Sequence, residues 1–125
     1  MSTTIWRFSD DKAGHDNQSY GLIQALAERI EIVVCELHVI DSGNAFISWL
    51  AGSYPPGRQL PDPDLLVGAG HATHWHLLAA RRARGGRVIV LMKPTLPMSW
   101  FDLCLVPEHD DPPALANLLC TRGVL

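Results

Sequence analysis

Val88-Ile89-Val90-Leu91-Met92 and Leu103-Cys104-Leu105-Val106 are the stretches of sequence that decide the fold of this chain. Each is apolar at every position, whereas a strand with one solvated face alternates between apolar and polar residues. Continuous apolar runs are typical of parallel strands in a sheet that helices cover on both faces. The two stretches therefore predict buried strands in an α/β protein.

The segments around these stretches alternate between strand patterns and helix patterns. Strands are expected over Thr4–Phe8, Glu31–Val39, Leu65–Val67, Arg87–Met92 and Phe101–Val106. Helices are expected over Asn17–Ile30 and Ala72–Arg84, and a last helix opens at Pro112-Pro113 and runs to about Cys120. Helices of about twelve residues between strands indicate βαβ units with right-handed crossovers. We therefore expect one Rossmann-like domain over residues 1–125, with three layers and a mostly parallel sheet of about five strands.

The helix expected over Asn17–Ile30 has a cap and a buried face. Asp16 precedes it and suits the N-cap position. Its apolar side chains recur at helical spacing and predict one buried stripe, made of Leu22, Ile23, Leu26, Ala27 and Ile30. Residues 41–64 are less regular. A short helix is expected over 45–50, and glycines and prolines exclude regular structure from most of the remainder.

Composition and charge exclude several classes of protein. The net charge is −3, so nothing draws the chain generally toward nucleic acid or an anionic membrane. We interpret the clustered arginines as a helix end and a solvated face; they are Arg81, Arg82, Arg84 and Arg87. No apolar run approaches the ~20 residues of a membrane-spanning helix, and the N-terminus lacks the apolar core of a signal peptide. Three cysteines without a CxxC motif indicate reduced thiols, which predicts a cytoplasmic protein.

Four of the expected strands end in a polar cluster. The clusters are Ser9–His15, Gly68–His71, Lys93-Pro94 and Pro107–Asp110. In an open parallel sheet, ligands bind beyond the carboxyl ends of the strands, and these ends share one edge. We therefore expect the four clusters to line one ligand site.

The first cluster and the helix start after it carry groups that bind anions or hydroxyls. Gly14 permits a sharp turn, and the unpaired N–H groups of a helix start favour anions. Lys12 and His15 add a charge and a donor, and Asn17 and Gln18 follow as further polar groups. The expected ligand is a phosphate, a carboxylate or a sugar hydroxyl. The alternative is a polar loop with a helix cap.

The second cluster, Gly68-Ala69-Gly70-His71-Ala72-Thr73, begins like the dinucleotide motif GxGxxG but has Thr73 in place of the third glycine. It follows the third strand and lacks an acid that would bind ribose, so we expect no nicotinamide cofactor. His71, His74 and His76 do not share one helix face, and no Cys or carboxylate lies nearby, so no metal is expected. We assign His71 to the site and expect the other two histidines to pack or face solvent.

The third and fourth clusters add Lys93, His109 and Asp110. Lys93 leaves the most apolar strand at the ligand edge, where it would hold an anion; alternatively, it is a surface lysine whose stem covers apolar neighbours. His109 and Asp110 would act as acid or base, or bind hydroxyls. Their alternative role is structural, with Asp110 or Asp111 as the cap of the last helix.

The same clusters resemble motifs of the mitochondrial-fission ELM family. The matching motifs are Asp10–Gln18 with Gly21 and Leu22, Pro63–His71, Leu91–Pro94, and Phe101–Pro107 with His109-Asp110. Plant members of this family are linked to mitochondrial fission. Many bacterial members carry the description of sugar-nucleotide epimerases, but this chain lacks the YxxxK pair of short-chain epimerases. The overall shape of the family is similar to a GT-B glycosyltransferase, in which two Rossmann-like domains face a cleft.

The resemblance implies roles for the residues that match it. It implies that the chain is the amino-terminal domain alone, which in GT-B enzymes contacts the acceptor, while the second domain holds the nucleotide-sugar donor and is absent here. His15 or His109 would be the base for an acceptor hydroxyl. The substrate would be bound by Lys12, Gly14, Asn17, Gln18, Gly68, Gly70, His71, Lys93 and Asp110. The isolated chain is expected to be inactive, without a cofactor.

A second function class stays open, that of a non-catalytic domain that binds a ligand or a partner. Its basis is an apolar group within residues 41–64, made of Phe46, Ile47, Trp49, Leu50 and Tyr54. If exposed, these side chains would contact a membrane surface, a lipid-linked acceptor or a partner; otherwise they pack under the sheet. In both function classes, the edge of the domain that faces the cleft is uncovered without a second domain, and this predicts self-association through that edge.

Overall fold

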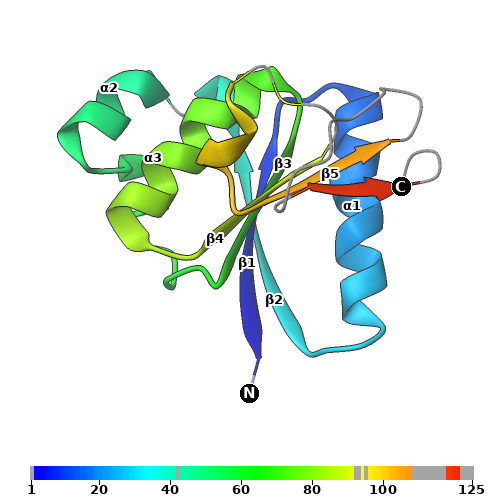
Figure 1. The fold of residues 1–125 in the computed structure, drawn as a ribbon. Coiled ribbons are helices and arrows are strands. Elements are labelled where there is room, and N and C mark those ends of the chain that lie inside the picture. The colour runs from blue at the N-terminus through cyan, green and yellow to red at the C-terminus, as the bar shows by residue number, and fades with distance from the viewer. Residues whose placement is uncertain (1, 42, 92–93, 95, 108–117, 122–125) are drawn as a thin grey trace.

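The computed structural model describes residues 2–41, 43–91, 94, 96–107 and 118–121. Within these residues, one all-parallel sheet has six strands in the order β2-β1-β3-β4-β5-β6. The prediction of a Rossmann-like α/β fold is confirmed (Figure 1). The strands are β1 (Thr3–Ser9), β2 (Ile32–His38), β3 (Leu65–Ala69), β4 (Arg87–Leu91), β5 (Leu103–Pro107) and β6 (Leu118–Thr121).

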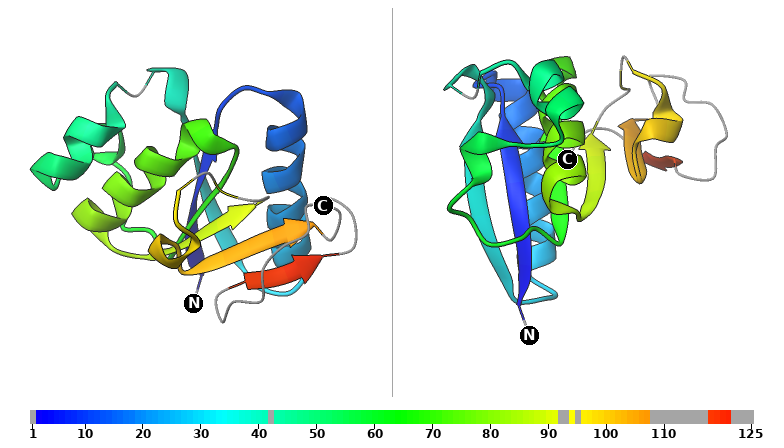
Figure 2. Two further views of the ribbon diagram at one scale, coloured as in Figure 1. Left: turned by 45° about the horizontal axis from the view of Figure 1, so that its top comes forward. Right: turned by 90° about the vertical axis from the view of Figure 1, so that its left-hand side faces the viewer.

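Helices give the sheet its two outer layers. In the described part of the chain, α1 (Ala13–Ala27) covers one face and α3 (His74–Arg84) covers the other (Figure 2). The shorter α2 (Ala45–Ala51) packs against α3 on the side away from the sheet. Short 3-10 turns complete the connections: η1 (Val39–Asp41), η2 (Pro55–Gly57), η3 (His71–Thr73) and η4 (Met98–Trp100).

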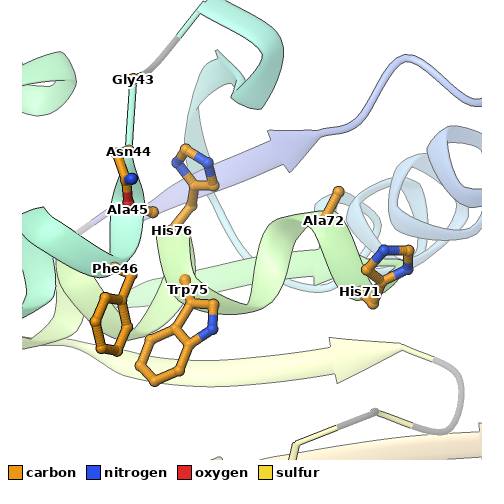
Figure 3. A pocket seen from close by; sticks show the side chains of 8 residues that line it. All are labelled: Gly43, Asn44, Ala45, Phe46, His71, Ala72, Trp75 and His76. Carbon is orange, nitrogen blue, oxygen red and sulfur yellow. The ribbon is translucent and has the colours of Figure 1, made fainter.

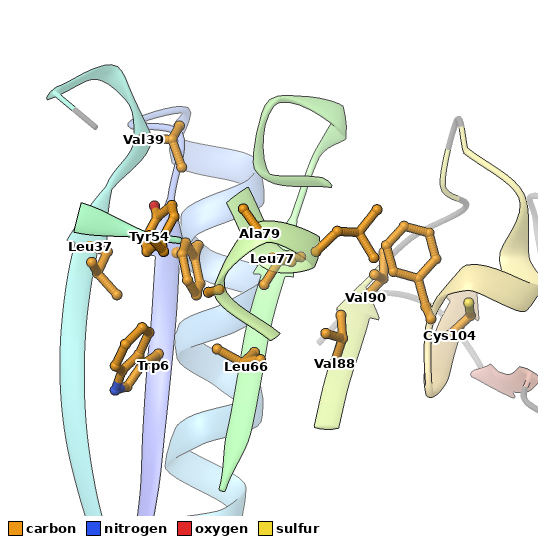
Figure 4. Close-up of a cluster of buried hydrophobic side chains, with 14 of the residues drawn as sticks. Trp6, Leu37, Val39, Tyr54, Leu66, Leu77, Ala79, Val88, Val90 and Cys104 are labelled. Carbon is orange, nitrogen blue, oxygen red and sulfur yellow. The ribbon is translucent and has the colours of Figure 1, made fainter. Parts of the chain in front are cut away.

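The two covered faces explain the continuous apolar runs. Val88 and Val90 belong to the core under α3, whereas Ile89 and Leu91 pack in the core under α1. Successive side chains of a strand point to opposite faces, so helices on both faces require apolar residues at every position. Trp6 is the largest fully buried side chain in the core under α3 (Figure 4). Its indole N–H donates to the backbone carbonyl of Pro61 at 3.0 Å.

Helix α1 begins earlier than the sequence predicts, at Ala13 instead of Asn17. Lys12 occupies the N-cap position without a capping hydrogen bond from its side chain. Gly14 and His15 therefore lie on the first helical turn and not in a loop. The early start brings the His15 ring within hydrogen-bond distance of the residue that follows β1.

Asp16 is not the expected helix cap, because its carboxylate pairs with Arg7 of β1. The buried Arg7 guanidinium lies 2.6 Å from Asp16 Oδ1, 2.8 Å from Glu36 Oε1 on β2 and 2.9 Å from Ser19 Oγ. Burial opposes the charge of Arg7, but hydrogen bonds to the two carboxylates raise its pKa above the ordinary value. This network fastens α1 to the two strands beneath it.

The buried stripe of α1 is shorter than predicted. Ile23 is buried and Leu22 and Leu26 are half-buried, whereas Ala27 and Ile30 are exposed. The helix ends at Ala27, so Ile30 lies beyond it and no longer follows its periodicity.

A strand stands where the last helix was expected to end. β6 pairs in parallel with β5, and Cys120 lies opposite Val106, so the helix prediction is wrong at Cys120. A short apolar run is compatible with both a helix and a buried strand, and here the backbone finds its hydrogen-bond partners on β5. The expected start of that helix at Pro113 lies outside the described residues.

The irregular segment between α2 and β3 is anchored by a few side chains. Tyr54 is buried, and its hydroxyl lies 2.9 Å from Nδ1 of His76 on α3. Arg84 donates to the carbonyls of Gly57 and Leu60 at 2.6 Å and 2.5 Å. The short helix predicted over residues 45–50 is confirmed by α2. The segment after it contains the 3-10 turn η2 and is held by these side-chain hydrogen bonds.

Candidate functional site

The strand order reverses at β1. From β1 the chain first adds β2 on one side and then crosses to β3 on the other side, after which β4, β5 and β6 follow outward. The connection after β1 leads to α1 on one face, and the connection after β3 leads to α3 on the other. In open α/β sheets, ligands bind between two such connections at the carboxyl ends of the strands. These connections carry two of the four predicted polar clusters.

A hydrogen-bonded pair of side chains, Asp10 and His15, lies at the end of β1. Nδ1 of His15 is 2.6 Å from Oδ2 of Asp10, while Oδ1 of Asp10 accepts from the backbone N–H of Lys12 at 3.1 Å. The Asp10 side chain is 2% exposed and that of His15 is 26% exposed. The contact depends on the early start of α1. Because the helix begins at Ala13, His15 lies on its first turn, within hydrogen-bond distance of Asp10 at the end of β1.

The carboxylate of Asp10 decides which nitrogen of His15 is available. An ionised carboxylate accepts hydrogen bonds only, so Nδ1 carries the proton of the bond. Nε2 then presents a lone pair, and it has no hydrogen-bond partner among the residues that the structure describes. A buried carboxylate behind a half-exposed imidazole is the arrangement that orients a general base.

Gly70 brings the second cluster against this pair. Its φ is +92°, and a Cβ atom at this position would overlap the His15 ring and lie 2.6 Å from Oδ2 of Asp10. The backbone after β3 therefore packs directly on the side chains after β1, and a side chain larger than that of glycine would displace them. The predicted meeting of these two clusters at one edge is observed in this contact.

Thr73, which replaces the third glycine of a dinucleotide motif, holds the turn after β3. Its hydroxyl donates to the carbonyl of Gly70 at 2.7 Å. A Cβ on Gly68 would lie 2.9 Å from the same hydroxyl oxygen, so the buried Gly68 makes room for Thr73. His71 follows at the start of η3 and is exposed.

The other predicted site residues near α1 differ in exposure. Lys12, Gly14 and Asn17 are exposed at the start of the helix, and an added Cβ on Gly14 would meet nothing within 4 Å. Gln18 is buried, one helical turn after His15. Lys12 and the exposed end of α1 are therefore open to a ligand, whereas Gln18 belongs to the packed side of the helix.

Lys93, His109 and Asp110 lie outside the described residues. The strands that precede them are described: β4 ends at Leu91 and β5 ends at Pro107, both parallel to β3. The strands that lead to the four clusters all run in the same direction, as their assembly at one sheet edge requires. The contacts of Lys93, His109 and Asp110 stay a prediction.

Asp11, in the loop between β1 and α1, has a strained backbone conformation. Its φ is +62°, a left-handed conformation that residues other than glycine rarely adopt. Its N–H donates to Ser9 Oγ at 3.2 Å, and its carboxylate lies 2.9 Å from Nδ1 of His38 at the end of β2. The hydrogen bond to Asp11 raises the pKa of His38 above the ordinary value. Local strain of this kind gathers at functional sites.

Sequence reasoning missed Asp10 and Thr73 as parts of this site. For Asp10, the available signal was an aspartate directly after a buried strand, because ligands bind at the carboxyl ends of parallel strands. His74 and His76 are both buried, as one of the two predicted alternatives states. Within the described ranges, no group of three or more His, Cys, Asp or Glu side chains is placed to hold a metal ion.

Comparison with known proteins adds family evidence to this geometry. The family model described as "Mitochondrial fission ELM1" matches residues 13–125 of the chain. An uncharacterized protein of Rickettsia prowazekii (strain Madrid E) is 24% identical over 115 residues, which cover 85% of this chain and 32% of the relative. The chain thus spans about one third of the length of that curated relative. No solved structure matches the chain.

Proposed function

The chain belongs to the mitochondrial fission ELM1 family, and we propose that it is the acceptor-side, amino-terminal domain of a sugar transferase. The two-domain GT-B arrangement is carried over from the resemblance of the family motifs. The chain spans 32% of its curated relative, which leaves room for a second domain in proteins of that length. In this proposal the second domain binds the nucleotide-sugar donor.

One observation carries the proposal: the Asp10–His15 pair packs against Gly70 at the reversal of the strand order. It joins a group with the chemistry of a base to the position where this sheet type binds ligands. The base has a free Nε2 within the described part of the molecule and a buried carboxylate behind Nδ1. Both features favour catalysis over a purely structural role for His15.

The proposed reaction moves one proton and exchanges one bond. An acceptor hydroxyl gives its proton to Nε2 of His15 while its oxygen attacks the anomeric carbon of the donor. The bond from that carbon to the nucleotide diphosphate breaks, and the electron pair leaves with the diphosphate. Asp10 holds the ring in the required tautomer and stabilises the imidazolium that forms.

His15 is the stronger of the two predicted bases. It has a defined carboxylate partner in the described structure, whereas His109 lies outside the described residues. In this account His109 contributes binding, and His15 takes the proton.

The test uses a two-domain protein that carries this chain as its amino-terminal part. Release of nucleotide diphosphate from a panel of nucleotide-sugars is measured with candidate acceptors present. We expect His15→Asn to reduce turnover by about 10²–10⁴-fold without changing the Kd of the donor, because a general base contributes about that much. A control variant on the same helix, Tyr20→Phe, keeps turnover, because Tyr20 is 52% exposed and lies outside the proposed site. Full activity in His15→Asn, or no nucleotide-sugar binding by calorimetry, contradicts the proposal.

A second candidate function is peripheral attachment to an anionic membrane. Its observation is a set of exposed apolar side chains on α2: Phe46, Ile47 and Leu50 are 45%, 60% and 56% exposed. Arg82 lies beside this surface, 5.3 Å above the ring of Trp49. Apolar side chains with a neighbouring cation suit the boundary between acyl chains and anionic headgroups. None of the described helices has the length and apolar character that crossing a bilayer needs.

Vesicle sedimentation tests this candidate. With vesicles of phosphatidylserine and phosphatidylcholine, the double variant Ile47→Asp with Leu50→Asp should lose pelleting. Ile30→Asp, a change at a similarly exposed position after α1, should keep it. Equal pelleting of all three proteins, or none, excludes the membrane role. Self-association through the cleft edge and a cytoplasmic location stay predictions, the former to be checked by light scattering.

A further inference from the structure

A pocket of about 500 Å³ lies between the start of α2 and the segment η3–α3, beside the predicted site (Figure 3). It is separate from the Asp10–His15 pair, yet it borders it, because His71 lines the pocket and directly follows Gly70. None of the described residues that line it is Lys, Arg, Asp or Glu. The lining residues are Gly43, Asn44, Ala45, Phe46, His71, Ala72, Trp75 and His76.

One wall of the pocket is aromatic and held in place. The rings of Phe46 and Trp75 meet edge to face, with centroids 4.8 Å apart. Behind them, Trp49 and Trp100 contact Trp75 at centroid distances of 5.4 Å and 6.0 Å. Three aromatic rings from α2 and η4 therefore fix the orientation of Trp75 on α3, so a ligand would meet a wall that needs no rearrangement.

The opposite side of the pocket offers neutral hydrogen-bonding groups. The His76 side chain points from α3 toward the segment with Gly43 and Asn44 (Figure 3). Its Nδ1 bonds to the Tyr54 hydroxyl at 2.9 Å, and burial lowers its pKa, so the ring is neutral at ordinary pH. Asn44 Oδ1 accepts from the N–H of Ile47 at 3.2 Å, which leaves the amide NH₂ as a donor.

The second nitrogen of His76 opens onto this pocket. His76 is only 7% exposed, and Nε2 has no partner among the described residues. The described part of the molecule contains no fully buried side-chain nitrogen or oxygen that lacks a partner. Nε2 is therefore accessible, and the space that His76 lines is this pocket. A buried histidine with one nitrogen anchored and the other turned to a pocket is placed to bind a polar ligand atom.

We propose that this pocket binds an uncharged sugar ring. The apolar C–H face of a pyranose would pack on Trp75 and Phe46, and its hydroxyls would bond to His76 Nε2 and the Asn44 amide. An anionic ligand is disfavoured because the lining residues include no Lys or Arg. The volume of the pocket exceeds that of a single water site and suits a ligand of one or two rings.

The inference concerns binding only, and it holds whether or not His15 acts as a base. If both proposals are correct, the edge of the sugar that lies beside His71 is the edge that faces the Asp10–His15 pair. A neighbouring hydroxyl of the same acceptor would then be the one that reacts. The two ideas are separable, because one rests on Phe46 and Trp75 and the other on His15.

Saturation-transfer NMR of this chain with methyl β-D-glucopyranoside and N-acetylglucosamine as probes tests the inference. Phe46→Ala and Trp75→Ala should weaken binding by about five- to tenfold, the range of an aromatic contact. Leu50→Ala, an exposed change on the same helix that does not line the pocket, should not. His15→Asn should also retain binding. Phe46 is 45% exposed, so its variant stays informative if Trp75→Ala fails to fold.

Four outcomes overturn the inference. The first is an absence of transfer to both glycosides in the parent chain. The second is equal binding by Phe46→Ala, Trp75→Ala and the parent. The third is binding that is lost only in His15→Asn, which would put the sugar on the Asp10–His15 pair instead. If uridine or adenosine saturates the aromatic wall and the glycosides do not, the ligand is a nucleobase and the sugar assignment is wrong.

Discussion

Nδ1 of His15 lies 2.6 Å from Oδ2 of Asp10, and the two side chains close over the backbone of Gly70 from a different βα unit. The pair joins the first turn of α1 to the end of β1, and Gly70 joins both to the end of β3. Segments far apart in the sequence thus share one contact at the edge where parallel sheets bind ligands.

Asp10→Asn should lower sugar-transfer turnover of the two-domain protein by about 10²–10⁴-fold, close to the loss in His15→Asn. An amide NH₂ would donate to Nδ1 of His15 and move the proton to Nε2, which removes the acceptor lone pair. The Kd for substrate should change little. A loss confined to KM, with kcat preserved, would show that Asp10 only shapes the binding site.

Gly70→Ala should abolish turnover and destabilise the fold by more than Gly85→Ala. Gly70 has φ +92° and ψ 148°, and Gly85 has φ +85° and ψ −160°, so both changes carry a backbone strain of about 1–3 kcal/mol. An added Cβ on Gly70 overlaps His15, whereas one on Gly85 meets nothing within 4 Å. Urea unfolding of the two variants separates the backbone strain, which both carry, from the overlap with His15, which only Gly70→Ala carries. Equal losses would mean that the pair does not pack on Gly70.

Removing both partners of Arg7 should cost more stability than removing Arg7 itself. In Asp16→Asn with Glu36→Gln, the buried guanidinium loses its countercharges, which costs about 3–5 kcal/mol. In Arg7→Met, the two carboxylates are left, but their side chains are 38% and 48% exposed and water can solvate them. Arg7→Met should therefore unfold at higher urea than the double variant. The reverse order contradicts this account of the network.

His74 should make the fold sensitive to acid. Burial, with a smaller contribution from His71, lowers the pKa of His74 to about 4, against 6.5 in the unfolded chain. The unfolded state therefore binds the proton first, and stability that is complete above pH 6.5 falls as pH drops toward 4. By about pH 5 the loss from this group is about 2 kcal/mol.

A His74→Gln variant should lose less stability than the parent between about pH 7.5 and pH 5, as measured by urea unfolding. His76 acts in the same direction through burial, so part of the loss remains. His38→Gln serves as the control, because the raised pKa of His38 stabilises the fold at low pH and that contribution fades as pH rises. An identical acid slope in the parent and in His74→Gln would rule out His74 as the source.

The fold was predictable because its decisive signal is local. The run Val88–Met92 is apolar at every position, which is typical of a strand in a parallel sheet that helices cover on both faces. The end of the chain was not predictable in the same way, because Leu118–Thr121 is too short for its periodicity to separate a helix from a strand, and its pairing with β5 decided the outcome. The start of α1 was mistaken because Asp16 suits an N-cap position by residue type, whereas it lies inside a helix that begins at Ala13 and its carboxylate pairs with Arg7.

The site was only partly predictable, for the same physical reason. A polar residue after a buried strand indicates a ligand edge, and this placed His15 and Gly70 together. The role of Asp10 depends on where the helix begins, because the start at Ala13 brings His15 within hydrogen-bond distance of Asp10. The pocket of Phe46 and Trp75 likewise forms only when α2 packs on α3.

The most direct test is the long-range ¹H–¹⁵N NMR spectrum of the histidine side chains, recorded with and without methyl glycosides. We expect His15 to carry its proton on Nδ1 in the free protein. We also expect the Nε2 signal of His15 and the amide signal of Gly70 to shift together when an acceptor sugar binds. A proton on Nε2 in the free protein, or sugar binding that leaves the signals of both His15 and Gly70 unchanged, would contradict the proposed role of the Asp10–His15 pair.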